Sequence, residues 1–311
     1  MLTKTSKKIL VEGVTLLVLD IIAVALRLWA RQIKRQRLGT DDVFAILALI
    51  CLICSAIVFI WGAADGGLGH HVNDLSMDTI ALFLKIQFAL QFPYLLSVTF
   101  IKLSILFFYE RVFPLPTFTT ATRCMCVFVI LWFITFFFAT LFQCWPISGN
   151  WQLGNAADTI NQYAMYAAAT ILESLADIVT LTIPIFVVWT MRHLSTRKKV
   201  MVTLLFLLGA FVCFASIMRL YYIVKYMGPN AKDDIDLTYN LADLVVWSGV
   251  EPPLGLICVC LPTLSPVFRD RKYPIVFVEL RDFLRSKFSG EDKSDNNESG
   301  HVLRPGDKNE P

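Results

Sequence analysis

The sequence predicts an all-α, polytopic membrane protein that forms a bundle of seven transmembrane helices. Hydrophobic residues make up 56% of the 311 residues and charged residues only 17%, which is unusual for a water-soluble domain. In addition, seven apolar stretches are long enough to cross a bilayer core of about 30 Å, which takes about 20 helical residues. Together these two observations favour lipid as the solvent of most of the chain.

We expect the spans at residues 9–29, 42–62, 80–108, 124–144, 162–190, 199–224 and 237–263. They define a seven-helix domain over residues 1–264, and residues 265–311 form a tail. Within the tail, residues 274–288 mix apolar and basic side chains in the manner of an amphipathic helix on a membrane surface. The polar residues that follow are typical of disorder.

The distribution of Lys and Arg predicts that the N-terminus lies outside the cell and the C-terminus in the cytoplasm. The loops after the first, third and fifth spans and the start of the tail hold four, two, four and four basic residues, 14 in all, against five on the opposite side. Basic residues concentrate on the cytoplasmic side of a membrane. Three lysines before the first span oppose this orientation, and cleavage of that span as a signal peptide would reverse it.

The first span carries one central acid, Asp20, which should face protein, whereas Glu12 and Arg27 lie near the ends and can reach the interface. The second span begins at Thr40-Asp41-Asp42. Here Thr40 or Asp41 is expected to cap the helix, and the carboxylates meet the positive end of its dipole. A second interpretation places this acidic pair on a cytoplasmic contact surface, whose candidate residues are Asp41, Asp42, Arg111, Lys198 and Lys199.

Further charged residues lie inside four of the later spans. The third span holds Lys102 about 10 Å from its inner end, and a charge in hydrocarbon must be paired, wetted or able to reach outward. In the fifth span, Glu173 and Asp177 share one helical face, which must turn inward. Arg219 in the sixth span either faces inward or reaches the outer interface. The seventh span places Asp243 and Glu251 on one face before Pro252-Pro253, where we expect a kink or a break.

These groups predict a polar network inside the membrane. Its carboxylates outnumber its cations by five to two, and the members are Lys102, Asp177, Glu251, Arg219, Glu173, Asp243 and Asp20. From depth alone, Lys102 pairs with Glu251 or Asp177, and Arg219 with Asp243 or Glu173. At least three acids must then be protonated, hydrated or matched by a bound cation. The network is either a set of ion pairs that fixes how the helices pack or a site that acts in sensing or transport.

Several other functions are not expected. The net charge of +3 is small and its basic residues are dispersed, unlike those of a nucleic-acid-binding protein. Adjacent His70 and His71 in the first external loop favour a solvated loop over a metal site. Only Cys144 of the eight cysteines falls at an external span end, so no disulfide is expected. HExxH, GxGxxG, P-loop and GxSxG motifs are absent, so we expect no enzyme.

The order and spacing of several short motifs resemble the fungal rhodopsin-domain family of seven-helix integral membrane proteins. The motifs are Arg27, Arg31, Gly39, Asp41 and Asp42; KLSILFFYERVF at 102–113; Cys144, Pro146 and Trp151; and Asp177, Arg219, Glu251 and Cys260-Leu261-Pro262. The resemblance implies a receptor-like sensor of unknown ligand in the plasma membrane, with a cytoplasmic partner such as a G protein. The alternative is a cation or proton-coupled transporter that uses the intramembrane carboxylates. The last span has no lysine for a retinal imine, so neither retinal nor another cofactor is expected.

Overall fold

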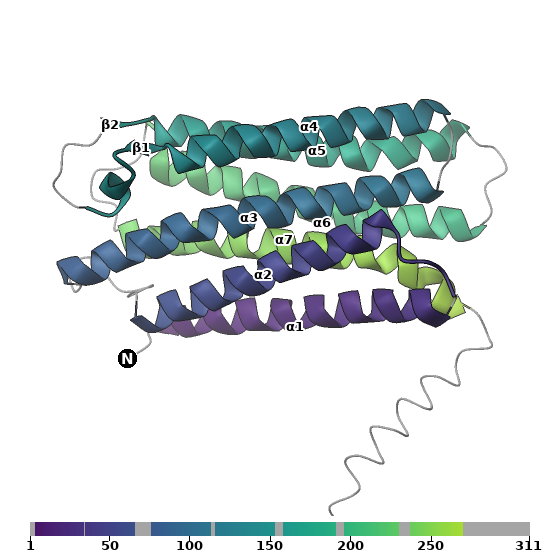
Figure 1. Ribbon diagram of the computed structural model, residues 1–311, viewed down its shortest axis with the longest axis horizontal. Coiled ribbons are helices and arrows are strands. Elements are labelled where there is room, and N and C mark those ends of the chain that lie inside the picture. Colours follow the sequence, from purple (N-terminus) through teal and green to yellow (C-terminus); the bar gives the residue numbers. More distant parts are fainter. Residues whose placement is uncertain are drawn as a thin grey trace, which may run out of the picture. The chain divides into compact units, whose positions relative to one another are not determined.

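The computed structural model describes residues 4–33, 35–65, 76–112, 116–152, 158–190, 196–229 and 237–269. They contain seven long helices that run alternately in opposite directions through one bundle (Figure 1). The helices are α1 (Lys4–Ile33), α2 (Thr40–Asp65), α3 (Met77–Val112), α4 (Pro116–Leu141), α5 (Gln162–Thr190), α6 (Thr196–Met227) and α7 (Leu237–Arg269). Each contains a segment long and apolar enough to cross a membrane, which confirms the predicted seven-helix class.

The two ends of the bundle differ. At one end, which we call the arginine end, α1 and α3 finish and α2 begins (Figure 1). At the other, the strand end, β1 (Cys144–Trp145) pairs antiparallel with β2 (Asp158–Thr159), and the 3-10 helix η2 (Ile147–Asn150) lies between them in sequence. The amphipathic segment predicted at 274–288 and the histidines of the first external loop lie outside the described residues.

Most helices extend a few residues beyond the expected spans, and α4 and α7 depart from the expectations for identifiable reasons. α4 begins at Pro116, eight residues before the expected start at 124, because proline suits the first helical position and the polar residues that follow extend the helix beyond its apolar part. α7 is assigned as one helix through Pro252-Pro253, so the expected break is absent. Both prolines are buried, and neighbouring helices allow a membrane helix to tolerate the hydrogen bonds that proline removes.

α3 occupies the centre of the bundle, and its second half is buried almost without interruption. Small residues let the neighbouring helices approach: Ala45 and Ala48 of α2 are wholly buried, and Gly209 of α6 lies against Leu181 of α5. Large apolar side chains remain exposed on the outer faces of α1, α2, α4, α5 and α6, as a lipid-facing surface requires. Lys102, which lies in this half of α3, is therefore deep inside protein.

Candidate functional site

Charged side chains gather in two buried clusters at different depths of the bundle. The first, which we call the interior cluster, joins α3, α5, α6 and α7 and consists of Lys102, Glu173, Asp177, Arg219 and Glu251. The second, the arginine cluster, joins α1, α2 and α3 and consists of Arg27, Arg31, Asp41, Asp42 and Arg111.

In the interior cluster, Lys102 forms an ion pair with Asp177. The Lys102 side chain is 7% exposed, and its ammonium group also donates to the main-chain carbonyl of Glu173 at 3.3 Å. The second oxygen of Asp177 accepts from the hydroxyl of Ser216 at 3.4 Å. Of the two acids that depth alone allowed for Lys102, the structure therefore selects Asp177.

Arg219 is the second cation of the interior cluster and faces inward, with 5% of its surface exposed. One terminal nitrogen forms an ion pair with Glu173 and donates to the Thr170 hydroxyl at 3.2 Å. The other lies 3.0 Å from Glu251 Oε2. The guanidinium also lies 5.0 Å from the centre of the Tyr94 ring, a cation–π distance. Arg219 thus bridges α5 and α7 and does not reach the membrane interface.

Hydroxyl groups complete the interior cluster. The Tyr94 hydroxyl lies 3.3 Å from Glu173 Oε1 and 3.1 Å from Glu251 Oε2, so its single proton can be shared between two acids. The Ser216 hydroxyl also contacts the other oxygen of Glu251, so its single proton is shared between Asp177 and Glu251. Three acids and two cations leave a formal charge of −1, and hydrogen bonds from hydroxyl groups offset part of the cost of burying it.

The sequence prediction missed Tyr94 and Thr170. Thr170 precedes Glu173 by three residues and therefore shares its helical face, which was an available signal. Nothing local distinguishes Tyr94 from the other aromatic residues of α3. The side chain of Asp243, the remaining candidate of the seventh span, lies outside the described residues.

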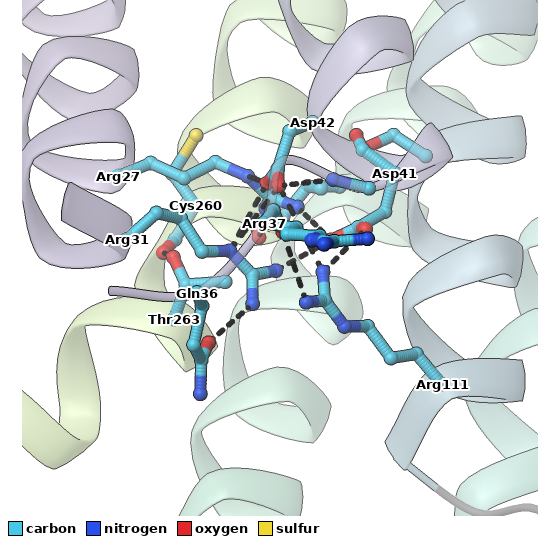
Figure 2. Close-up of polar contacts among 12 residues, drawn as sticks. Arg27, Arg31, Gln36, Arg37, Asp41, Asp42, Arg111, Cys260 and Thr263 are labelled. Atoms are coloured by element: carbon cyan, nitrogen blue, oxygen red, sulfur yellow. Dashed lines mark hydrogen bonds and ion pairs between the residues drawn. The ribbon is translucent and has the colours of Figure 1, made fainter. Parts of the chain in front are cut away.

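The arginine cluster is built around Arg27, which is completely buried (Figure 2). Its guanidinium donates to Asp42 Oδ1 at 2.8 Å, to Asp41 Oδ2 at 2.6 Å and to the carbonyl oxygen of Val259 in α7 at 2.6 Å. Arg31, one helical turn later, donates to Asp41 Oδ2 at 2.7 Å and lies 3.2 Å from Asp42 Oδ2. Two arginines of α1 thus form ion pairs with both carboxylates of α2.

Arg111 brings α3 to the same carboxylates. Its Nη1 lies 3.1 Å from Asp41 Oδ1 and 3.8 Å from Asp42 Oδ2, and its Nη2 donates to the carbonyl of Arg37 at 3.2 Å. In contrast to Arg27, the Arg111 side chain is 36% exposed. A second bond from α3 comes from the Ser104 hydroxyl, which donates to the main-chain carbonyl of Asp41 at 2.6 Å.

Three expectations about this region need correction. Asp41 and Asp42 are 2% and 0% exposed, so their carboxylates do not form a contact surface. Arg27 is inside the bundle and not at the interface, because two carboxylates at the start of α2 compensate its charge. The helix cap is Gly39, whose carbonyl accepts the first helical bonds and whose N–H donates to Asp42 Oδ2 at 3.0 Å. The four-residue spacing of Arg27 and Arg31 was the signal available for this cluster.

The other contact candidates have different surroundings. Lys198 and Lys199 lie in the first turn of α6, and their side chains are outside the described part of the chain. The exposed Arg123 of α4 pairs with Glu110 at 2.9 Å. Arg111 is therefore the one predicted contact residue with a described, partly exposed side chain.

A cavity of about 430 Å³ lies beside the interior cluster, and all seven helices contribute to its wall. The wall is mainly apolar, and its polar members include Asp20, Gln91, Tyr94, Glu173 and Arg219. Asp20 is completely buried, and neither carboxylate oxygen has a hydrogen-bond partner among the described residues. Within the same residues, no group of three or more His, Cys, Asp and Glu side chains is arranged to hold a metal ion. The cavity has the volume and apolar character of a site for a small organic molecule.

Comparison with known proteins places this architecture in a family. The sequence model of the fungal rhodopsin domain matches residues 26–270, which contain both clusters but not Asp20. The polyenoic acids biosynthesis gene cluster protein Ba17b of Metarhizium anisopliae is 27% identical over 83% of this chain and 72% of its own. A SAT4 family membrane protein of Emericella nidulans is 30% identical, over 74% and 55% of the two chains. Receptor GIN3 of Arthrobotrys oligospora is 25% identical, over 79% and 59%. The chain belongs to the fungal rhodopsin domain family of multi-pass membrane proteins.

Proposed function

We propose that this protein is a non-catalytic, receptor-like sensor of the plasma membrane. In this proposal, a small apolar molecule enters the cavity and changes the pairing of the interior cluster. The arginine end faces the cytoplasm, as the distribution of basic residues favours, and reports the change to a partner such as a G protein. The observation that carries the proposal is that Glu173 and Arg219 belong both to the cavity wall and to the interior cluster.

Two helices connect the cavity side to the arginine end. α3 contributes Tyr94 and Lys102 to the interior and Arg111 to the arginine cluster. α7 contributes Glu251 to the interior and the carbonyl of Val259 to Arg27. A displacement of either helix therefore changes contacts in both clusters, which is the kind of bistable element that a switch requires.

Arg111 is the side chain through which a partner would engage this switch. It is the most exposed arginine of its cluster, and its contact to Asp42, at 3.8 Å, is the longest ion pair described in that cluster. Only the arginine of this pair is exposed, and both carboxylates keep Arg27 and Arg31 when Arg111 leaves, so Arg111 exchanges partners at lower cost than its buried neighbours. The names of two relatives, Receptor GIN3 and a protein of a polyenoic acids biosynthesis gene cluster, agree with a receptor for a natural small molecule.

The test uses cells in which one half of a split luciferase is fused to the C-terminus and the other half to a G-protein α subunit. The cells are challenged with an organic-solvent extract of fungal culture medium. We expect the extract to change luminescence in the wild type and not in Arg219→Gln at equal expression. Arg111→Gln should change the signal before challenge, whereas Arg123→Gln, which removes an arginine that is 73% exposed, should behave as the wild type.

Two results would contradict the sensor proposal. The first is an extract response that persists in Arg219→Gln. The second is the absence of any change in luminescence when the cells receive a fraction of the extract that binds the purified protein.

A second candidate function, cation or proton-coupled transport, has its own observation. The described interior holds three buried acids, Asp20, Glu173 and Glu251, and the partly buried Asp177, against two cations. Surplus carboxylates inside a membrane suit a site that takes up and releases a cation or a proton. Ion flux in reconstituted vesicles that disappears in Asp177→Asn and Glu251→Gln would favour this function. Partner recruitment without flux would favour the sensor.

A further inference from the structure

Asp20 has a more costly environment than the other acids of the interior. It lies in the middle of α1, is 0% exposed and has no hydrogen-bond partner among the described residues. A carboxylate in such surroundings carries a large desolvation penalty unless a cation or a donor compensates it. Asp20 is also a wall residue of the cavity. The compensating group can therefore be supplied by a molecule in the cavity.

The cations near Asp20 are already engaged. Lys102 pairs with Asp177, and Arg219 pairs with two other acids. Arg27 lies two helical turns, about 10 Å, along α1 from Asp20 and is saturated by the carboxylates of α2. With every group ionised, the four acids and two cations of the interior have a formal charge of −2. A bound cation is the occupant that this balance favours.

Unsatisfied polar atoms also concentrate at the cavity. Six buried side-chain nitrogen or oxygen atoms of the described residues lack a hydrogen-bond partner, and four of them belong to residues of the cavity wall. Those four are both carboxylate oxygens of Asp20, Oε1 of Gln91 and Nε of Arg219. Three of these atoms are hydrogen-bond acceptors, so most of the unsatisfied groups in the wall require a hydrogen-bond donor from an occupant. Unsatisfied groups are rare in protein interiors, and their clustering around one cavity indicates an occupant.

We propose that the cavity binds a mainly apolar organic cation, with an ammonium group against Asp20 and the apolar body among the side chains of α3, α4 and α5. The wall supplies Trp132 and Phe136 for the apolar body, and Gln91 accepts a further hydrogen from the ammonium or a nearby donor. The free Nε–H of Arg219 donates to a hydroxyl or carbonyl elsewhere on the molecule. This inference rests on the proposed function, because it names the class of molecule that the sensor would detect.

Three probes with one carbon skeleton test the charge requirement: 4-phenylbutylamine, 4-phenylbutanol and 4-phenylbutanoic acid. Binding is measured by equilibrium dialysis of the full chain in lipid nanodiscs against empty nanodiscs, with thermal unfolding as a second readout. We expect the amine to bind at least about tenfold more tightly than the alcohol, as a desolvated charge-assisted contact provides. The acid should bind weakest.

Variants assign this preference to Asp20. In Asp20→Asn the amine and the alcohol should bind about equally, whereas Glu110→Gln, which removes a carboxylate of α3 outside the cavity wall, should keep the preference. If Asp20→Asn does not fold, Ala169→Phe, which fills the cavity from α5, should abolish binding of all three probes. Equal binding of amine and alcohol to the wild type, preference for the acid, or no saturable binding would overturn the proposal.

The same measurements separate this inference from the sensor itself. Amine binding without a change in partner recruitment would support the cation site and contradict the sensor. Recruitment driven by neutral or acidic molecules, with no preference for the amine, would support the sensor and contradict the cation site.

Discussion

Replacement of Arg27 by methionine tests whether the arginine cluster holds the bundle together. Methionine keeps most of the volume of the buried arginine but removes its charge and its donors. The variant loses the 2.8 Å bond to Asp42, the 2.6 Å bond to Asp41 and the 2.6 Å bond to the carbonyl of Val259. These three bonds join α1 to both α2 and α7.

The structure sets the size of the effect. Loss of one partner of a buried ion pair costs about 3–5 kcal/mol because the other charge remains buried. Here both carboxylates keep Arg31, and Asp41 also keeps Arg111, so the expected loss lies near the lower limit, about 3 kcal/mol. Arg111→Met removes the same type of side chain from the same cluster, but from a site that is 36% exposed. Its expected loss is below about 1 kcal/mol.

The free energy of unfolding can be measured by titration of the purified protein with SDS in mixed micelles, followed by tryptophan fluorescence. Asp42→Asn in the Arg27→Met background provides a double-mutant cycle. Because the double variant no longer buries an under-compensated acid, its loss should be smaller than the sum of the two single losses by about 1–3 kcal/mol. Equal losses for Arg27→Met and Arg111→Met, or strict additivity in the cycle, would refute the view that burial gives Arg27 its importance.

Three further predictions concern the two clusters. Lys102→Met should leave Asp177 without its cation and reduce the amount of folded protein in the membrane fraction, and Asp177→Asn in the same chain should restore part of it, as fluorescence-detected size exclusion can show. Gly39→Ala should destabilise the bundle by about 1–2 kcal/mol, because the added Cβ would lie 2.7 Å from the Arg111 guanidinium and closer still to a carboxylate. Arg219→Lys should cost about 2 kcal/mol in the SDS titration, because one ammonium cannot replace two guanidinium nitrogens that contact different acids.

Each of these predictions has its own control or contrary result. If Asp177→Asn restores no folded protein in the Lys102→Met background, Lys102 acts through another contact. Gly13→Ala is the matched control for Gly39→Ala, since its Cβ would meet no atom within 4 Å, and in a helix interior it should stabilise by about 0.5–1 kcal/mol. An Arg219→Lys variant as stable as the wild type would show that the double contact is unimportant.

Much of the fold could be predicted from the sequence alone, and the span at 162–190 illustrates the reason. Span five coincides with α5 at both ends, because a run of apolar residues reports its own transfer into lipid without reference to neighbours. The start of α4 at Pro116 was missed for the converse reason: a polar first turn is helical but not hydrophobic. Hydrophobicity sets the ends of a membrane span and backbone hydrogen bonds set the ends of a helix, so the two need not begin and end at the same residues.

The candidate site was accessible only in part. The sequence predicted an acidic partner for Lys102 and, in the case that it faces inward, for Arg219, and depth reduced the choice to two acids for each. The rotation of each helix about its axis decides which acid each cation contacts. It also decides that Arg219 pairs with Glu251 in addition to Glu173. The arginine cluster was interpreted as a cap and a contact surface, because the loop between α1 and α2 does not show which faces of the two helices meet.

The sequence by itself determined the number of helices and the polar faces of the fifth and seventh spans, since each of these follows from composition and spacing along one stretch of chain. The order of its short motifs carried the resemblance to the family. Tertiary structure alone decided that Arg27 is buried against Asp41 and Asp42 and that Tyr94 contacts two acids. It also decided that Asp20 lies in the wall of a cavity without a hydrogen-bond partner among the described residues. The physical reason is that the energy of a charge depends on the few atoms within about 4–6 Å of it. In this bundle, those atoms come from helices that are far apart in sequence.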